Sequence, residues 1–226
     1  PFQFSAQLWN ANLVTTTRFM FDKCLGLSEV HDFPDDPNLP FEFDNIETCD
    51  YMFFKCINFK FTPNLTLSRW RFPLIVGSNA SQTITMRSMF EGCDKFNEEI
   101  RWEDPTNNSS TRKVSNTIQM FKNCLSYTNG VTSGSTNPSF IFCADSLQNA
   151  NFMFYNCQAF NSNIIFTNSN SSSIPQFKNT MFLKNSSGMF QDCINYNNGE
   201  PVNISVPNNP LIMTMNSNQN VSQMFY

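Results

Sequence analysis

Cysteine is the residue type whose number and spacing could do chemistry in this chain. Eight cysteines are enough for a disulfide framework in a secreted protein. A zinc site would need clustered ligands, such as two cysteines separated by two residues, and the sequence contains no such pair. Because six cysteines hold the same place in a recurring motif, we expect a ladder of buried, reduced thiols. The ladder cysteines are Cys24, Cys56, Cys93, Cys124, Cys157 and Cys193.

The single histidine, His31, lies beside a cluster of acidic residues. Asp32, Asp35 and Asp36 follow it in a segment flanked by prolines, which could bind a cation. A solvated insertion loop is the favoured interpretation of this segment. The sequence has no nucleophile elbow, phosphate-binding loop or metalloprotease motif. We therefore expect no catalytic residues, no metal, no cofactor and no enzyme activity.

Sequons of the form Asn-x-Ser/Thr offer a second kind of chemistry, the attachment of N-glycans in a secretory route. The eight sequons hardly exceed the roughly six that the Asn, Ser and Thr content predicts. Their number therefore does not show glycosylation, and N-glycans stay an open expectation. The acceptor residues are Asn64, Asn79, Asn107, Asn108, Asn170, Asn185, Asn203 and Asn220.

A Met-Phe-x-x-Cys motif is the strongest pattern in the sequence. It occurs six times at intervals of 31 to 37 residues, and an aromatic residue or Leu follows three residues after each Cys. About one Met-Phe pair is expected by chance, so the fixed offsets indicate an internal repeat. A seventh copy, Met224-Phe225, is cut off by the end of the sequence, and we expect this chain to be a fragment of a longer one. The motif phenylalanines are Phe21, Phe53, Phe90, Phe121, Phe154 and Phe190.

Two hydrophobic periods alternate within each repeat. Val114, Ile118, Phe121 and Cys124 fall at helical offsets, and residues 46–56 and 147–157 show the same spacing. These offsets predict a short helix that ends at the motif Cys. Downstream of Cys every second residue is apolar, which predicts short strands with one inward face. The predicted strands begin at Phe41, Leu65, Ile100, Phe140, Ile164 and Ile204.

A strand-and-helix unit of about 34 residues cannot bury its own apolar face, whereas stacked units can. We therefore predict an α/β repeat solenoid, a leucine-rich-repeat-like stack of short parallel strands and short helices. It forms a single domain over residues 1–226, with six repeats and a truncated seventh. Tetratricopeptide and ankyrin repeats are excluded, because each unit has a strand pattern and no second helix pattern. A parallel β-helix without helices is the alternative fold.

One row of residues should line the outer face of the predicted sheet. Side chains alternate across a strand, so the residue between two inward positions faces outward. Such faces are the usual contact surface of curved repeat proteins. Ile141 and Ile165 would make an adjacent apolar pair beside Arg101, interpreted either as a protein contact or as an idle exposed pair. The predicted binding row is Glu42, Thr66, Arg101, Ile141, Ile165 and Ser205.

Composition excludes several classes of protein. Charged residues make up 14% of the chain, and its 25 phenylalanines must be buried somewhere, which argues against disorder. The formal net charge of −4 gives a nucleic-acid partner no electrostatic support. No apolar run approaches the roughly 20 residues of a membrane-spanning helix.

The longer motif Met-Phe-x-x-Cys-x-x-Phe-Asn-x-x-Ile is complete at 89–100 and 153–164. It resembles the repeat of BspA-like leucine-rich repeat surface proteins, and the resemblance covers nearly the whole chain. The repeats here are longer than the roughly 25 residues usual in that family, and Phe and Asn replace much of the Leu and Ser. The resemblance implies a solenoid, and a location at a cell surface or in an adhesion protein of a microbe.

Two functions follow as expectations. The first is a non-enzymatic binding or adhesion module at a cell surface, in the extracellular space or on a virus particle. The second is a structural building block of a large assembly, such as a virion coat or an extracellular filament. Partners would be a protein or further copies, bound through the sheet face and the solenoid ends. Because a solenoid needs polar caps, and Phe2, Phe4 and Met224-Phe225 lie near the ends, we expect other repeats or subunits to cover them.

Overall fold

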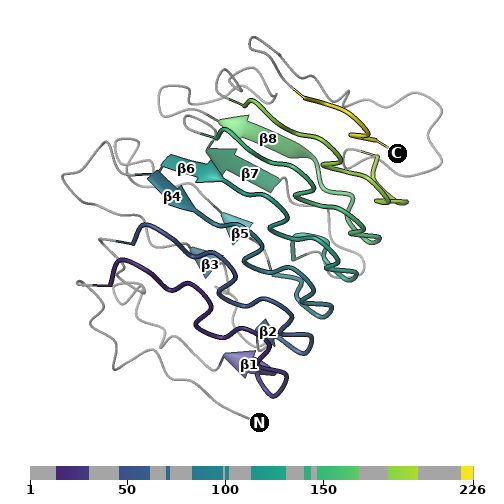
Figure 1. Ribbon diagram of the computed structural model, residues 1–226. Coiled ribbons are helices and arrows are strands. Elements are labelled where there is room, and N and C mark those ends of the chain that lie inside the picture. The colour runs from purple at the N-terminus through teal and green to yellow at the C-terminus, as the bar shows by residue number, and fades with distance from the viewer. Residues whose placement is uncertain are drawn as a thin grey trace.

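Seven similar turn units make up most of the residues described in this computed structural model. Each contains one copy of the motif, and Figure 1 shows them side by side in chain order from the N-terminus to the C-terminus. We name each unit by its motif Met and count positions from that Met. The structure describes residues 14–30, 46–61, 70–71, 83–98, 100–101, 113–130, 140–143, 147–167, 183–197 and 220–225.

The strands are short, and all of their pairings are parallel. They form two-stranded sheets that pair β1 with β2, β3 with β5, β4 with β6, and β7 with β8. Three of them, β5, β7 and β8, begin where the sequence predicts strands, and the strands predicted from Phe41, Leu65 and Ile204 lie outside the described residues. The strands are β1 (Glu29–Val30), β2 (Lys60–Phe61), β3 (Trp70–Arg71), β4 (Thr83–Thr85), β5 (Ile100–Arg101), β6 (Lys113–Asn116), β7 (Phe140–Cys143) and β8 (Ile164–Thr167).

A ladder of parallel bridges joins all seven units at one position, four residues before the motif Met. Thr or Asn stands there in every unit, and at Thr16, Thr48, Asn116 and Asn220 its side-chain oxygen accepts a hydrogen bond from the backbone N–H two residues later. In the Met89 and Met189 units that N–H donates instead to a side chain of the preceding unit, Asp50 or Asn151. Asn185 Nδ2 also donates to Asn149 Oδ1 at 2.8 Å. The ladder residues are Thr16, Thr48, Thr85, Asn116, Asn149, Asn185 and Asn220.

The segment through the motif consists of turns, and the helices predicted over 46–56, 114–124 and 147–157 are absent from those described residues. In the Met120 unit, Met120 N–H donates to Thr117 O, Cys124 N–H to Phe121 O, and Tyr127 N–H to Cys124 O. Each of these hydrogen bonds spans three residues. Inward positions therefore recur every three or four residues, which is the spacing that imitates a helix.

Two residues in each complete unit adopt left-handed backbone angles, which prevents a helix from continuing. They stand directly before the motif Met and three residues after it. In the Met52 unit, Tyr51 has φ 58° and Lys55 has φ 56°. Both are the third residue of a hydrogen-bonded turn, where a type II turn requires positive φ. Bulky side chains seldom adopt this conformation, so neighbouring contacts must stabilise it.

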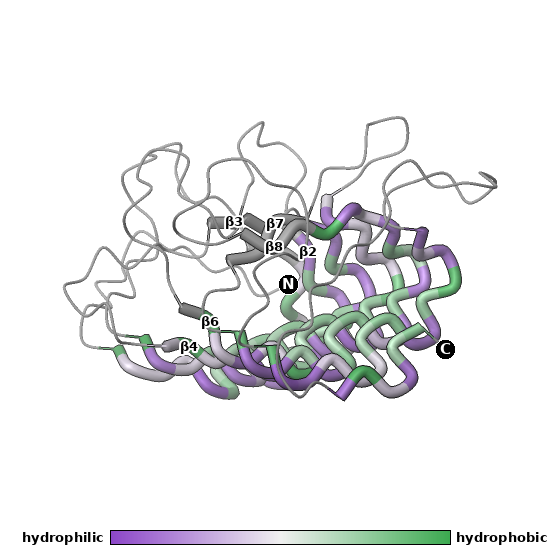
Figure 2. The backbone as a smooth tube through the Cα atoms, turned by 90° about the horizontal axis from the view of Figure 1, so that it is seen from above, coloured by the Kyte–Doolittle hydropathy of each residue, from purple (hydrophilic) through white to green (hydrophobic). Residues whose placement is uncertain are grey.

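Backbone hydrogen bonds connect each unit to the next in a repeating pattern. Phe121 N–H donates to Met153 O at 2.8 Å, and Asn123 N–H donates to Tyr155 O at 2.9 Å. Amides at positions −3, −1 and +1 donate to the following unit throughout the stack, and in most units the motif Met amide closes a turn within its own unit. Amides four or five residues before the motif Met donate in the opposite direction, as Gln148 N–H does to Ser115 O. Figure 2 shows the resulting parallel rungs from above. The α/β solenoid, with the parallel β-helix as its alternative, remains a prediction for the chain as a whole.

Candidate functional site

The motif phenylalanines stack ring on ring along the inside of the units. Centroids of successive rings are 5.2, 5.6, 5.7, 5.4 and 5.7 Å apart from Phe21 to Phe190, and the rings are nearly parallel. Phe53, Phe90, Phe121, Phe154 and Phe190 are buried, while Phe21 in the first unit is half-buried. Each ring removes apolar surface from water and gains stacking contacts with two neighbours.

A second aromatic column runs beside the first, seven residues after the motif Met. Phe59, Phe96, Tyr127, Phe160 and Tyr196 stack with centroids 5.7 to 5.8 Å apart. Within a unit the two columns also contact one another, as between Phe154 and Phe160 at 4.2 Å. Leu27 occupies the same position in the Met20 unit and is buried.

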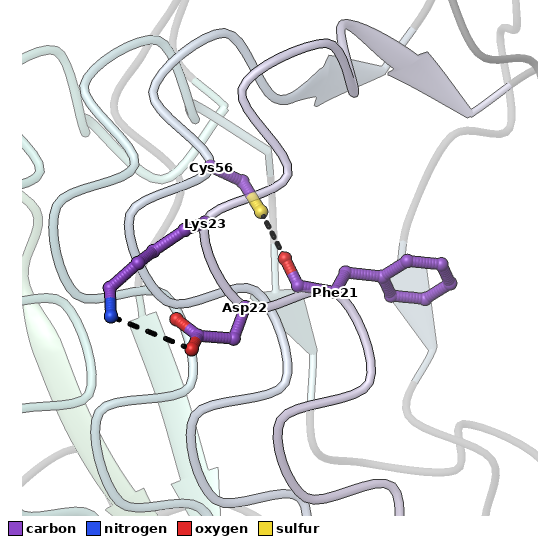
Figure 3. A network of polar contacts seen from close by, with 4 residues as sticks. All are labelled: Phe21, Asp22, Lys23 and Cys56. Atoms are coloured by element: carbon purple, nitrogen blue, oxygen red, sulfur yellow. Dashed lines mark hydrogen bonds and ion pairs between the residues drawn. The ribbon is translucent and has the colours of Figure 1, made fainter.

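The motif cysteines form hydrogen bonds that link successive units. Cys56 Sγ donates to Phe21 O at 2.9 Å, as Figure 3 shows. Cys93, Cys124, Cys157 and Cys193 each donate to the carbonyl of the motif Phe in the preceding unit, at 2.7 to 2.9 Å. Each of these carbonyls also accepts the Cys N–H of its own unit. The thiol therefore acts as a small apolar group and as a donor.

Burial raises the pKa of these thiols. Desolvation is the largest cause, and it raises the pKa of Cys56 and of Cys193 to about 12, from an ordinary value of 9.0. The pKa values of Cys93, Cys124 and Cys157 are also raised by burial. Because the thiolate is the reactive form, these cysteines are held in an unreactive state at neutral pH.

No cysteine with a described side chain forms a disulfide. Cys24 differs from the rest of the ladder because its thiol is exposed, which contradicts the prediction of burial at that position. It belongs to the first described unit, so no earlier motif Phe carbonyl among the described residues faces it. Cys49 is buried and forms no disulfide. The described residues contain no group of three or more His, Cys, Asp or Glu side chains that could hold a metal ion.

The predicted binding row is only partly described. Arg101 lies on β5, Ile141 on β7 and Ile165 on β8. The β7–β8 register pairs Ile141 with Ile165, and β5 lies against β7. The structure therefore brings these three positions onto neighbouring strands. Glu42, Thr66 and Ser205 lie outside the described residues, as do His31 and the acidic cluster beside it.

Two of the eight sequons fall on the bridge ladder. Asn185 uses its Nδ2 group, where a glycan would be attached, to donate to Asn149. Asn220 is exposed, and its Oδ1 accepts the Ser222 N–H. The other sequon asparagines lie outside the described residues.

A cluster of rings and cations on the outer side of the first three units was missed by the sequence analysis. Phe19 and Tyr51 stack at 4.9 Å, and Phe54 meets Tyr51 edge-on at 5.6 Å. Arg18 lies 4.9 Å from the Phe19 centroid, and Lys55 lies 5.2 Å from the Phe54 centroid. Lys23 and Arg87 lie within 6 Å of Phe54 and Tyr51. We call this cluster the cation–aromatic face, and its members are Arg18, Phe19, Lys23, Tyr51, Phe54, Lys55 and Arg87.

These features define a protein built from repeated turn units that stack through backbone, thiol and aromatic ladders. The chain belongs to the family described as Mycoplasma protein of unknown function, DUF285. The family pattern matches residues 40–166 and, again, residues 74–199. The second match starts 34 residues after the first, which is about one repeat, so the same pattern fits the chain in two registers.

Neither a curated protein nor a solved structure matches the chain. Within the part of the chain that the structure describes, no helix is long and apolar enough to cross a membrane.

Proposed function

We propose that this chain is a BspA-like surface protein, a non-enzymatic module that presents its repeat surface for protein binding or adhesion at a cell or particle surface. The observation that supports this most is the contrast within each turn unit. Inward positions repeat the same residue types, and their thiols are protonated hydrogen-bond donors. Outward positions vary from unit to unit, as the cation–aromatic face illustrates. A core with the same residue types in each unit, combined with a surface that varies from unit to unit, suits recognition of extended surfaces.

The binding site that we propose is the row that includes Ile141 and Ile165. Their pairing across β7 and β8 places two apolar residues side by side on a parallel ladder. Adjacent apolar side chains on a repeat surface often mark a protein contact. A location at a cell surface, in the extracellular space or on a virus particle is part of this proposal, with the family resemblance as its support.

An adhesion assay with a double variant tests this function. Beads coated with the chain should adhere to a cultured cell layer, and Ile141→Asp with Ile165→Asp should abolish the adhesion while the circular dichroism spectrum stays unchanged. The matched control is Leu125→Asp with Ile194→Asp, which charges two apolar residues that are 39% and 73% exposed and lie outside the strands. Unchanged adhesion by the Ile141, Ile165 variant would remove the proposed site.

The repeated pattern of inter-unit backbone hydrogen bonds favours a second candidate function, a building block that assembles end to end. Every inter-unit amide at positions −3, −1 and +1 donates toward the C-terminal neighbour. The last described unit leaves Phe225 60% exposed, with its ring stacked on Phe190 from one side. A further unit of the same kind would find there the surface that every earlier unit offers to its neighbour. Sedimentation velocity over a range of concentrations tests this, with Phe225→Asp expected to abolish any self-association.

A further inference from the structure

The cation–aromatic face is confined to the first three turn units. It is made of residues at positions −2, −1, +2 and +3, which are the outward corners of the turns. In the Met153 unit the same corners include Phe152 and Tyr155, whose rings meet edge-on at 5.9 Å, with one cation, Lys122, 5.7 Å from the Tyr155 ring. The other corners of the Met153 unit and all four of the Met189 unit carry no cation. The four cations of the face, Arg18, Lys23, Lys55 and Arg87, are all exposed. They form a local positive surface on a chain whose formal net charge is −4.

The carboxylates near this face compensate only part of its positive charge. Asp22 lies 3.7 Å from Lys23 Nζ, and the side chain of Asp50 accepts the Arg87 backbone N–H at 2.8 Å. In the Met89 unit, which also supplies Arg87, Glu91 pairs with Lys122 at 3.3 Å, which directs that carboxylate toward a cation outside the face. Two carboxylates against four cations leave an excess of positive charge, which attracts anions.

Phe19 and Tyr51 turn their ring edges outward, whereas the Phe54 ring is turned 76° from Tyr51 and has Lys23 and Lys55 5.8 and 5.2 Å from its centroid. Phe19 stacks on Tyr51 along the direction in which the units stack, so the two ring planes lie across that direction and the ring edges face outward. The edge of an aromatic ring is the positive part of its quadrupole. Ring edges and cations therefore both attract anions. A nucleic-acid base, in contrast, would need an open ring face on which to stack.

The backbone of this face has no amide left for a polypeptide partner. Phe19 N–H donates to Asp50 O, Tyr51 N–H to Arg87 O, and Lys55 N–H to Glu91 O. The backbone N–H groups of Arg18 and Asp50 donate to the hydroxyls of Thr16 and Thr48. An extended peptide that adds to a protein edge uses such backbone groups, so the available recognition is through side-chain charge alone.

We infer that the cation–aromatic face binds a linear anionic polysaccharide, through the sulfate or carboxylate groups of successive sugars. This surface is distinct from the Ile141 and Ile165 row, and the inference goes beyond the proposed function. Cations on successive units offer a linear polyanion several weak contacts at once, which add up along the chain of the ligand. Salt should weaken the binding, because exposed charges are screened.

Heparin is the probe, with neutral dextran, polyglutamate and an oligothymidylate as the other arms. The test variant combines Arg18→Asn, Lys55→Asn and Arg87→Asn in the full chain. Asn is the residue that the Met153 unit carries at the corresponding positions, as Asn151 and Asn156. The matched control combines Lys60→Asn, Lys95→Asn and Lys184→Gln, which removes three positive charges from exposed lysines outside the face.

We expect the wild-type chain to bind heparin, to ignore dextran, and to lose affinity as sodium chloride is raised. The test variant should bind heparin at least tenfold more weakly, and the control should change by less than twofold. Equal losses in test and control would overturn the inference, as would tighter binding of polyglutamate or oligothymidylate than of heparin. If the triple variant does not fold, Lys55→Asn and Arg87→Asn are measured singly, and no loss in either would also overturn it. If only the Ile141, Ile165 variant loses cell adhesion, adhesion does not depend on the cation–aromatic face. The heparin result then stands apart from the proposed function.

Discussion

The inner and outer sides of the same turns follow different rules. On the inner side, position +1 is Phe in all seven units and position +4 is Cys in the six complete ones. On the outer side, position −1 changes from Phe19 to Tyr51 to Gln119, although all three adopt left-handed angles. An inward side chain contacts its own copy in the next unit, so a change at one unit disturbs two contacts. An outward side chain has fewer such partners, and its identity is free to serve binding.

Alkaline pH should have the largest effect on the inner side, because five buried thiols there have raised pKa values. Their pKa values are raised in the folded chain, to about 12 for Cys56 and Cys193, whereas unfolded thiols titrate near 9.0. Above pH 9 the unfolded state loses these protons and the folded state keeps them, so stability falls as pH rises toward 12. Urea unfolding at several pH values measures this slope. The slope should shrink in Cys93→Ala with Cys157→Ala, and an unchanged slope would contradict the assignment.

Phe121→Ala should destabilise the chain by about 3–5 kcal/mol, because it opens a cavity in the first aromatic column where that column contacts the second. The Phe121 ring contacts Phe90, Phe154 and Tyr127, with centroids 5.7, 5.4 and 4.5 Å away. Urea unfolding measures the change. The outer-side control is Phe54→Ala, whose half-buried ring should cost well under half as much. Equal costs would mean that inner and outer rings contribute alike.

Gly188→Ala should cost about 1–3 kcal/mol through overpacking. A Cβ on Gly188 would overlap the Phe152 ring, which lies over it on the outer side. Other units carry larger residues at this left-handed position, so the ring and not the backbone angle is the main obstacle. The control Gly26→Ala has nothing within 4 Å of the new Cβ and should be nearly neutral. Thermal unfolding should show recovery in Gly188→Ala with Phe152→Leu, and a lack of recovery would point to the backbone instead.

Asn116→Ala should have the smallest effect, about 1 kcal/mol, the usual net value of one hydrogen bond. It removes the acceptor for the Ile118 N–H, now at 3.0 Å. Asn116→Thr should retain most of the stability, because Thr48 accepts the Asp50 N–H in the same way at 3.2 Å. Chemical denaturation distinguishes the two substitutions. A Thr variant as unstable as the Ala variant would show that the amide serves another purpose.

Sequence reasoning reaches the inner side more easily than the outer one. Phe21, Phe53 and Cys56 stand at fixed offsets from their motif Met, so stacking the units places equivalent residues in columns whatever the connectors do. The prediction of helices was wrong for a local reason, because turns closed over three residues place apolar residues at helical spacing. What rules out a helix is positive φ at residues such as Tyr51 and Lys55. Those side chains give no hint of it, because bulky residues rarely adopt that conformation.

The cation–aromatic face was missed because residue types vary at its positions, so no repeated motif marks them. Arg18, Tyr51 and Arg87 stand at fixed offsets from their motif Met, but other residue types occupy the same offsets in other units. The parallel bridges at Thr16, Thr48 and Thr85 align these three units. The binding row is an intermediate case, because the strand pattern places Ile141 and Ile165 at equivalent positions and the register pairs them.

The restriction of the inter-unit hydrogen bonds to neighbouring units has a mechanical consequence. Tension applied between the two ends of the stack would act on one boundary at a time, since each unit holds only its immediate neighbours. A boundary that yields would release one repeat of 31 to 37 residues, or on the order of 110 Å of extended chain. A stack under load would therefore lengthen in similar steps and absorb energy at each one. The same ladder that orders the core would thus make the chain an extensible tether.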